Sequence, residues 1–373
     1  MKRFIFSVLI ISCVLILVSC SDFEGATDEE NIIKQESVEG ELTVHYIDAG
    51  QADATLFEWK EDDRQYTMLY DTGDWNKTDV IDYLHEREVD EIDVIIISHP
   101  HADHIGQLKN ILETFTVHEV WMPGTESNSQ TFEDAITAIL DNDDINYEEP
   151  RAGDNYNIGH LAIEIIHPET IINKPNEDSI SFIATFNEIK FAFTGDAGVN
   201  EEQQMIERME NIQANFLHLG HHGSNTSTSL EFLRAVNPDY AIYSAGESNS
   251  YNHPHEEVIQ RLTDENIPYF GTDINGTITI QTDGEDYEIF SKADDAENDS
   301  SHQETNNNAA KNCIDINNAS TEELEKIIHV GPGRAEHIIK NRPYEDLAEL
   351  NVINGLSDAR VSEIIDEGIA CLQ

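Results

Sequence analysis

The sequence predicts an α/β domain, in which mixed β-sheets are covered by helices, followed by a small all-α domain. Between residues 41 and 291, short apolar runs alternate with stretches of helical periodicity, as is typical of sheets packed against helices. Residues 292–312 are rich in Asp, Asn, Ser and Glu without apolar periodicity, which is typical of a disordered linker. Helical runs interrupted by glycine fill residues 313–373. A chain of 373 residues with 39% hydrophobic content is long enough for both domains.

The first half of the predicted α/β domain opens with strands. Residues 41–48 alternate apolar and polar side chains, with Leu42, Val44 and Tyr46 in phase, as expected of a strand with one buried face. Apolar runs predict the further strands, and apolar side chains at helical spacing predict the helices. In chain order the expected strands are 54–59, 66–70, 92–97 and 117–122, and the expected helices are 78–88, 105–115 and 132–140.

The second half of this domain continues the mixture. Residues 180–186 and 190–193 are expected to form a hairpin, and residues 256–266 are expected to form a helix. The remaining expected strands are 161–166, 214–219, 269–270, 277–280 and 287–290.

The N-terminus predicts export and lipid anchoring. Two basic residues precede an apolar run over 4–18 that is too short for a comfortable membrane span, which is typical of a signal peptide. Residues 17–20 resemble the lipobox of bacterial lipoproteins, in which the cysteine is lipidated. We therefore expect a signal peptide over 1–19, lipidation of Cys20, an acidic tether over 20–40, and a location on the extracellular face of the cell membrane. An uncleaved apolar anchor is the alternative.

The charge of the chain is strongly negative. It contains 74 Asp and Glu against 21 Lys and Arg, a formal net charge of −53. The acidic residues are spread along the whole chain, so they indicate adaptation of the surface to high salt or an alkaline medium. Such a charge also repels polyanions at long range.

Four side chains of metal-ligand type follow one predicted strand. The run from Ile92 to Ile97 is typical of a strand buried on both faces. Directly after it come His99, His101, Asp103 and His104. Imidazole and carboxylate groups suit zinc, or manganese or iron where carboxylates contribute, and a two-metal site needs ligands in two neighbouring groups. The sequence therefore predicts a metal site at this strand end; a solvated histidine-rich loop is the alternative.

Other expected strands also end in ligand-type side chains. These are Asp71 after strand 66–70, His167 after strand 161–166, Asp196 after strand 190–193, and His221 with His222 after strand 214–219. Ordinary strand-end turns are the alternative at each place.

Several of these motifs resemble one family. The H-x-H-x-D-H pattern over 99–104 resembles the signature of metallo-β-lactamase (MBL) fold hydrolases. Residues 48–54 resemble the D-V-G-Q-G-D-A turn in the MBL domain of the competence DNA-channel protein ComEC, with Ala49 and Ala52 in place of Val and Gly. Residues 220–224 and 252–254 resemble its G-H-H-G-S and N-x-Y-x-H-P elements. The resemblance implies an αβ/βα sandwich of two mixed sheets flanked by helices, and a hydrolase with two divalent ions, zinc or manganese.

The resemblance also implies roles for single residues. Asp196 would bridge the two ions, and Asp71 would hydrogen-bond the metal-site loops into position. One of His221 and His222 would close the second metal site, with His222 favoured as the ligand and His221 as its acid/base neighbour. The implied ligands are His99, His101, Asp103, His104, Asp196 and His222, with His167 an open candidate because the ComEC-like branch often lacks a ligand there. The implied catalytic residues are Asp103, His221 and His253.

The C-terminal stretch resembles a tandem helix-hairpin-helix domain of the DNA receptor ComEA. Ser320 and Glu323 form a capping box, and glycines interrupt the helical runs near residues 331–333 and 354–357. The resemblance implies sequence-independent binding of the DNA backbone through Lys326, Gly331, Gly333, Arg334 and Lys340. Glycines there let backbone N–H groups approach a phosphate beside a helix N-terminus. Because acids outnumber bases in this domain, a helical module that binds protein or only stabilises itself is the alternative.

The cysteines fit an oxidising compartment. Cys13 leaves with the signal peptide and Cys20 takes lipid, which leaves Cys313 and Cys371 as a natural disulfide pair around the C-terminal domain.

These features predict a surface-anchored, metal-dependent hydrolase, a phosphodiesterase or nuclease that acts on DNA in competence or DNA scavenging. The competing enzyme hypothesis is a phosphorylcholine-esterase-like hydrolase of cell-wall teichoic acid. The non-enzymatic hypothesis is a DNA-binding receptor whose MBL domain is only a scaffold. The membrane is expected to be contacted through the lipid anchor alone, and no protein partner follows from the sequence.

Overall fold

The computed structural model describes residues 40–291 apart from 63 and 210, and residues 314–372 with interruptions at 345, 354–355, 357–359, 362–363 and 366–369. The predicted signal peptide, Cys20, residues 21–39 of the tether and the linker therefore lie outside the described residues. Within the described ranges, no helix has both the length and the hydrophobicity needed to cross a bilayer.

The first sheet has eight strands in the order β15-β14-β1-β2-β3-β4-β5-β6. The strands are β1 (Leu42–Tyr46), β2 (Thr55–Glu61), β3 (Arg64–Tyr70), β4 (Glu91–Ile96), β5 (Thr116–Trp121), β6 (Asn146–Glu148), β14 (Ile278–Thr282) and β15 (Tyr287–Ser291). Val44 lies opposite Phe57 on one side and Ile280 on the other. Pairing is antiparallel from β15 to β3 and parallel from β3 to β6, so the sheet is mixed.

The second sheet has seven strands in the order β13-β12-β11-β10-β9-β8-β7. The strands are β7 (Asn155–Ile158), β8 (Leu161–His167), β9 (Ser181–Phe186), β10 (Ile189–Phe193), β11 (Phe216–His218), β12 (Tyr240–Tyr243) and β13 (Tyr269–Gly271). The expected hairpin is β9 with β10, and it is antiparallel. From β10 to β13 the pairing is parallel, so this sheet is mixed as well.

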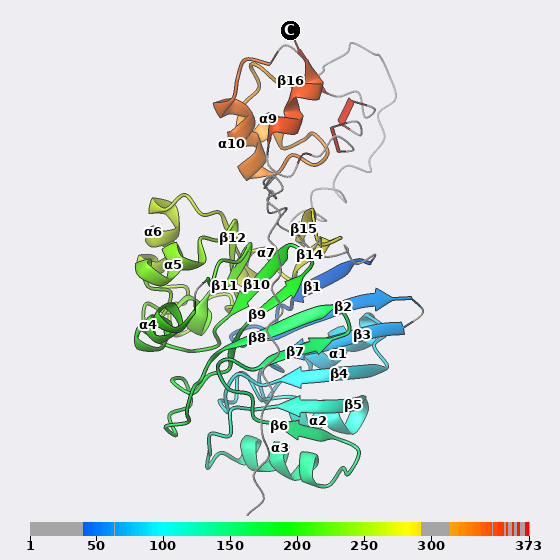
Figure 1. Ribbon diagram of the computed structural model, residues 1–373, viewed down its shortest axis with the longest axis vertical. Coiled ribbons are helices and arrows are strands. Elements are labelled where there is room, and N and C mark those ends of the chain that lie inside the picture. The colour runs from blue at the N-terminus through cyan, green and yellow to red at the C-terminus, as the bar shows by residue number, and fades with distance from the viewer. Residues whose placement is uncertain are drawn as a thin grey trace, which may run out of the picture. The chain divides into compact units, whose positions relative to one another are not determined.

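The two sheets face each other, and helices cover their outer faces (Figure 1). The first sheet is covered by α1 (Asp79–Glu86), α2 (Leu108–Thr114) and α3 (Gln130–Leu140). The second is covered by α4 (Val199–Arg208), α5 (Leu230–Val236) and α6 (Glu256–Asp264), and a short α7 spans Thr272–Asn275. The predicted αβ/βα sandwich of two mixed sheets is therefore confirmed.

Central strands are apolar along their whole length because they are buried on both faces. In β10, Phe191 and Phe193 point into the core between the sheets, whereas Ala192 packs under the helices. In β4, Ile96 faces the other sheet and Ile95 faces the helices. A strand with two buried faces reads as a continuous apolar run, which is the pattern that predicted these strands.

The structure differs from the expected elements where apolar periodicity is weak. The helix expected from residue 105 begins only at Leu108, because the preceding residues form the turns that carry the ligand-type side chains. Helix α4 is absent from the sequence expectations, since its sequence is mostly polar and Met205 is its one buried apolar side chain. Helix α5 and strand β7 were likewise not expected from the sequence.

The C-terminal unit has its own small apolar core. The predicted capping box is confirmed at α9 (Thr321–Leu324), where Ser320 and Glu323 each accept a backbone N–H of the other. Further elements are α10 (Pro332–Lys340), the 3₁₀ segment η2 (Leu347–Val352), and a parallel pair of β16 (Ile314–Asp315) with β17 (Ala370–Cys371), which the all-α expectation did not include. Cys371 is disulfide-bonded, whereas Cys313 lies outside the described residues.

Candidate metal centre

Ligand-type side chains from both sheets meet at one edge of the sandwich. The loop after β4 carries residues 99–104, Asp196 follows β10, and the 3₁₀ segment η1 (Gly220–Gly223) after β11 carries His221 and His222. The backbone N–H of His221 donates to Gly195 O at 3.0 Å, which ties η1 to the Asp196 loop. His221 and His222 have φ angles of 53° and 56°. Such left-handed backbone is uncommon outside glycine and concentrates at functional sites.

Asp196 lies between two groups of imidazoles. Its Oδ1 is 3.4 Å from His104 Nε2, and its Oδ2 is 3.5 Å from His99 Nε2. His101 Nδ1 lies 2.9 Å from His99 Nε2. Ligand-type atoms of Asp196 therefore belong to one group with His99 and His101, and to a second with Asp53, His104 and His222.

The geometry distinguishes the two adjacent histidines of η1. His222 is buried, its Nδ1 donates to Ser244 O at 3.0 Å, and its free Nε2 lies 3.4 Å from Asp103 Oδ2. His221 is partly exposed, with Nε2 3.4 Å from Asp196 Oδ2. His222 thus has the buried, oriented nitrogen that suits a ligand, whereas His221 borders solvent.

Buried polar atoms without partners indicate that this cluster fits a metal ion. Within the described part of the chain, His104 Nε2, His222 Nε2 and Asp196 Oδ1 are buried and have no hydrogen-bond partner. Buried polar atoms are almost always hydrogen-bonded. Imidazole nitrogens with carboxylate oxygens are a donor set that zinc, manganese and iron accept. A bound cation would satisfy all three atoms at once.

The pKa values of the cluster reflect its burial and its charges. Burial raises the pKa of Asp196 to about 6. Burial alone would lower the pKa of His104, yet the carboxylates of Asp196 and Asp71 raise it to about 10. Although burial opposes its ionisation, Asp53 and Asp103 hold the pKa of His222 well above its ordinary value. The carboxylates therefore hold positive charge at this edge, as protons when no metal is bound.

Asp71 orients the loop that carries the first ligands. Its Oδ1 accepts the backbone N–H of Ser98 at 2.7 Å, and its Oδ2 accepts the Ser98 hydroxyl and His104 Nδ1, each at 2.8 Å. A histidine whose Nδ1 donates to a carboxylate presents Nε2 to the metal and keeps a fixed ring orientation. Asp71 is fully buried, so it acts through His104 and does not face the cavity.

Asp53 is a site residue that the sequence reasoning missed. It is buried, and Oδ1 lies 3.5 Å from His218 Nε2 and 3.6 Å from His222 Nδ1, while Oδ2 lies 3.8 Å from His104 Nδ1. Burial alone would raise the pKa of Asp53, but His222 and His218 hold it well below its usual range. Although Asp53 belongs to the second group, its carboxylate faces the Nδ1 atoms of His104 and His222, whereas Asp103 lines the cavity, so Asp103 stays the candidate ligand. Its position in the motif over 48–54 was the available signal.

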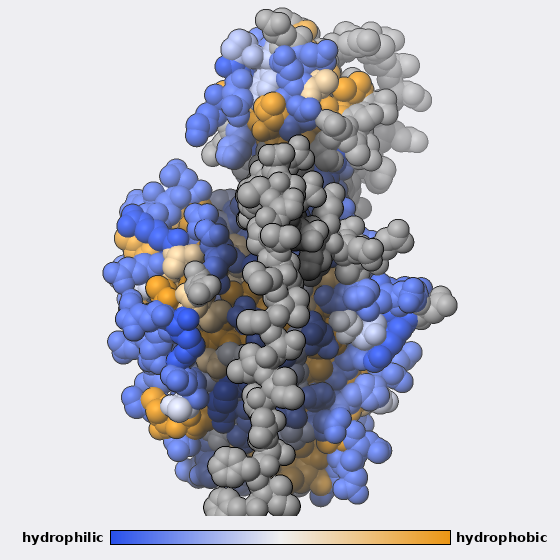
Figure 2. Space-filling model, in the orientation of Figure 1, coloured by the Kyte–Doolittle hydropathy of each residue, from blue (hydrophilic) through white to orange (hydrophobic). Residues whose placement is uncertain are grey.

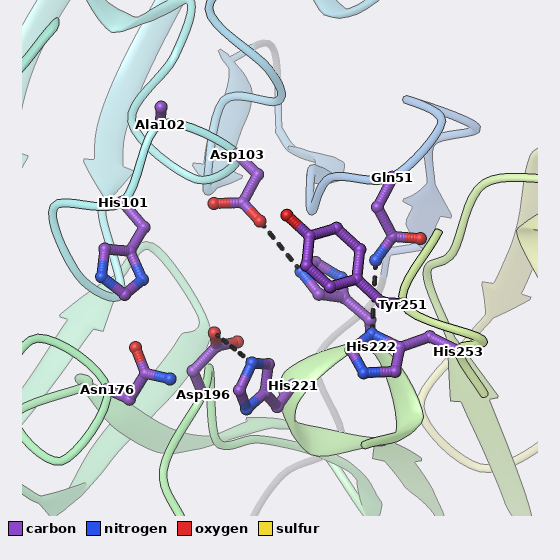
Figure 3. Close-up of a pocket in the computed structure, with 10 residues that line it drawn as sticks. All are labelled: Gln51, His101, Ala102, Asp103, Asn176, Asp196, His221, His222, Tyr251 and His253. Atoms are coloured by element: carbon purple, nitrogen blue, oxygen red, sulfur yellow. Dashed lines mark hydrogen bonds and ion pairs between the residues drawn. The ribbon is translucent and has the colours of Figure 1, made fainter. Parts of the chain in front are cut away.

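A cavity of about 370 Å³ opens over the cluster (Figure 3). It is lined by Gln51, His101, Ala102, Asp103, Asn176, Asp196, His221, His222, Tyr251 and His253. All three predicted catalytic residues, Asp103, His221 and His253, therefore border the same space. Gln51, Asn176 and Tyr251 are further lining residues to which the sequence analysis gave no role.

The structure does not bring His167 to this cluster. His167 Nε2 donates to Glu177 O at 2.8 Å, and neither group of ligand-type side chains includes His167. The predicted phosphate-contact residues lie in the C-terminal unit, where Lys326 follows α9 and the other four lie at the start of α10 or within it. There Gly331 is the N-cap, Pro332 opens the helix, and Arg334 donates to His329 O at 2.9 Å.

We predict that His104 holds metal and that His167 does not. Wild-type protein reconstituted with zinc or manganese should contain two ions per chain. His104→Ala should lose roughly one ion or more, because a ligand nitrogen is removed, whereas His167→Ala should keep the wild-type content. Elemental analysis measures this, with circular dichroism as the check on folding. Equal metal loss in two folded variants would contradict the assignment.

We also predict that metal binding at neutral pH releases protons. In the metal-free protein His104, with a pKa of about 10, and His222 carry protons that a metal must displace from Nε2. Apparent affinity should therefore fall as pH is lowered. Isothermal titration calorimetry in HEPES and in Tris should give different binding enthalpies, because released protons are taken up by the buffer. Identical enthalpies would refute proton release.

Comparisons with known proteins agree with this architecture. A model of the metallo-beta-lactamase superfamily matches residues 47–247, and a model of the helix-hairpin-helix motif matches residues 309–367. ComE operon protein 3 of Bacillus subtilis is 30% identical over 259 residues, which are 65% of this chain and 33% of that protein. Competence protein ComA of Neisseria gonorrhoeae is 28% identical over 247 residues, 64% of this chain and 32% of that protein. A deoxyribonuclease of a Thioalkalivibrio species is 41% identical over 61 residues, 16% of this chain and 17% of that protein.

This chain spans about a third of the length of the Bacillus and Neisseria relatives. The resemblance noted from the sequence motifs is thus confirmed for the family of the α/β domain and for the helix-hairpin-helix motif. The superfamily model covers more than half of the chain, over the stretch that carries the candidate ligands. This chain belongs to the metallo-beta-lactamase superfamily.

Proposed function

We propose that this protein is a metal-dependent phosphodiesterase that cleaves DNA. The observation that carries this function is the carboxylate of Asp196, buried between two groups of imidazoles in a chain that also contains a helix-hairpin-helix motif. Two divalent ions, zinc or manganese, held by His99, His101, Asp103, His104, Asp196 and His222 would supply hydroxide near neutral pH and neutralise the charge that develops at phosphorus. The names of the competence and deoxyribonuclease relatives support the same substrate.

His221 is arranged to accept a proton beside Asp196. Thr226 Oγ1 donates to Ser224 Oγ at 3.0 Å, so it accepts from His221 Nδ1, which lies 3.1 Å away. The proton of the neutral imidazole is then on Nδ1, and Nε2 keeps a lone pair. Burial lowers the pKa of His221 to about 4, so the ring is neutral at physiological pH. A lone pair at the cavity edge suits a general base.

His253 is arranged in the opposite sense, as a donor. The amide oxygen of Gln51 accepts the Gly246 N–H at 3.1 Å, which turns the Gln51 amide nitrogen toward His253 Nδ1 at 3.4 Å. His253 Nδ1 then accepts, and the proton of the neutral ring is on Nε2. Burial lowers the pKa of His253 to about 4. A neutral N–H that borders the cavity can donate a hydrogen bond to a phosphoryl or leaving-group oxygen.

The C-terminal unit would retain DNA, and the α/β domain would cut it. At the N-cap of α10, Gly331 has open space around it, so a phosphate could approach the backbone N–H groups of the first turn. Such contact is with the backbone and not with bases. A DNA-binding module on the same chain would raise the local concentration of DNA at the site.

The net charge of −53 opposes this binding. Hydrophilic side chains dominate the described residues on the face shown in Figure 2. We therefore expect weak, sequence-independent affinity for DNA that improves with divalent cations, since these neutralise both partners.

We further propose that the enzyme works on the outer face of the cell membrane. The apolar run over 4–18 and Cys20 in a lipobox support export and lipid anchoring. DNA outside the cell would then be the substrate.

Hydrolysis of DNA should depend on Asp196. Asp196→Asn keeps the shape of the side chain but removes the shared charge, so the rate on plasmid and oligonucleotide DNA with manganese or zinc should fall by roughly 100-fold or more. Gel-based cleavage assays on the full mature chain measure this. Undiminished hydrolysis by the variant, or no hydrolysis by the wild type, would refute the proposed function.

Lys326→Glu should weaken DNA binding without slowing the chemical step. Lys326 is exposed in the C-terminal unit, and charge reversal beside a phosphate should raise KM for DNA by roughly three- to tenfold while kcat stays constant. The matched control is Lys60→Glu, which makes the same change in net charge at an exposed lysine near the C-terminal end of β2. Equal effects from both variants would show that net charge, and not the C-terminal unit, sets the affinity for DNA.

A further inference from the structure

No lysine or arginine side chain lines the cavity above the candidate metal centre to bind a polyanion. None of the ten residues that line it is Lys or Arg, and two of them, Asp103 and Asp196, are carboxylates. Phosphate recognition elsewhere relies on such cations. A DNA strand in this cavity must therefore gain its affinity from metal contacts and from groups that do not depend on charge.

Tyr251 offers such a group at the cavity wall. Its side chain is 62% exposed, although it belongs to the lining (Figure 3). The loop beneath it is fixed by the amide of Asn249, whose Oδ1 accepts the N–H of Tyr251 at 3.1 Å and that of His253 at 3.0 Å. The Asn249 amide nitrogen donates to Gly246 O at 2.9 Å and to His253 O at 2.5 Å. The Tyr251 side chain therefore faces solvent, while hydrogen bonds fix the loop that carries it.

The ring of Tyr251 begins a column of aromatic rings that leads to the metal ligands. It stacks on His253 with 5.6 Å between ring centroids and 24° between planes. His253 in turn stacks on His222 at 6.0 Å and 27°. One face of the Tyr251 ring is therefore supported from beneath, while its large exposure leaves the rest of the ring available to a ligand.

We propose, on the basis of the phosphodiesterase function above, that Tyr251 is a stacking platform for an unpaired base of the strand being cleaved. Stacking of bases on aromatic side chains tolerates any sequence and needs no positive charge, which fits a cavity without Lys or Arg. In a duplex both faces of a base are covered by its neighbours, so the base must first leave the stack. The enzyme consequently selects single-stranded over double-stranded DNA.

The test compares two strands that differ only in their bases. One is an oligothymidylate, and the other is an abasic strand of the same length, with the same diesters and charge. Wild-type, metal-loaded full-length protein should cleave the oligothymidylate with a kcat/KM roughly tenfold higher than the abasic strand, and higher than the corresponding duplex. Tyr251→Ala should lose most of this preference, whereas Tyr251→Phe, which keeps the ring, should retain it.

Tyr147→Ala is the matched control. Tyr147 is a 40% exposed tyrosine on β6 that does not line the cavity, so its removal should leave the preference for bases unchanged. An equal loss of kcat/KM by Tyr251→Ala on both strands, or no loss on either, would overturn the stacking role. DNA hydrolysis by the wild type would still support the phosphodiesterase. Hydrolysis of the phosphodiester p-nitrophenyl phosphorylcholine without cleavage of any DNA would overturn both the stacking role and DNA as the substrate, because a quaternary ammonium group also uses an aromatic face.

Discussion

The hydrogen bonds of the buried Asp71 carboxylate connect the fold to the site. Asp71 directly follows β3, and it accepts hydrogen bonds from the backbone N–H and the hydroxyl of Ser98, two residues after β4, and from His104 Nδ1. Hydrogen bonds to a charged acceptor each contribute about 1.5 to 3 kcal/mol, and more is lost when a buried one is broken. The same carboxylate therefore fastens two parallel strands at their carboxyl ends and sets the ring orientation of a ligand. Residues 99–104 can form turns at this edge because Asp71 holds Ser98, the residue that precedes them.

Excess buried negative charge is the second constraint. Asp53, Asp71 and Asp196 are all buried around the same histidines, and buried carboxylates are costly unless positive charge balances them. In the metal-free protein, protons on His104 and His222 supply that balance. A divalent ion supplies more positive charge in the same place. The cluster is thus suited to binding cations.

The proposed hydrolysis of DNA and the proposed binding of DNA make opposite demands on the charge of this protein. The carboxylates around the candidate metal centre and the acidic composition of the chain both repel DNA. The arrangement can still work if charge-independent contacts and backbone N–H groups hold the strand. Gln51 and Asn249 support the charge-independent contacts, since their amides orient His253 and the loop of Tyr251 without adding charge. The helix-hairpin-helix motif offers the backbone N–H groups.

The sequence by itself determined the strands buried on both faces, the ligand-type side chains directly after them, the capping box of α9 and the family of the α/β domain. These features depend on periodicity and on neighbours within a few residues, which a sequence displays. It did not display α4, whose polar surface hides a single buried apolar side chain. A weakly patterned helix forms only because a sheet is present to cover.

Only the tertiary structure decided which side chains converge. It brought Asp53 behind His104 and His222, which are far from it in the chain, and it turned His167 toward the carbonyl of Glu177. It also distinguished His222 from His221, because adjacent residues of a left-handed turn project toward different surroundings. Side-chain orientation at such a site is set by packing between distant segments, so no local pattern encodes it.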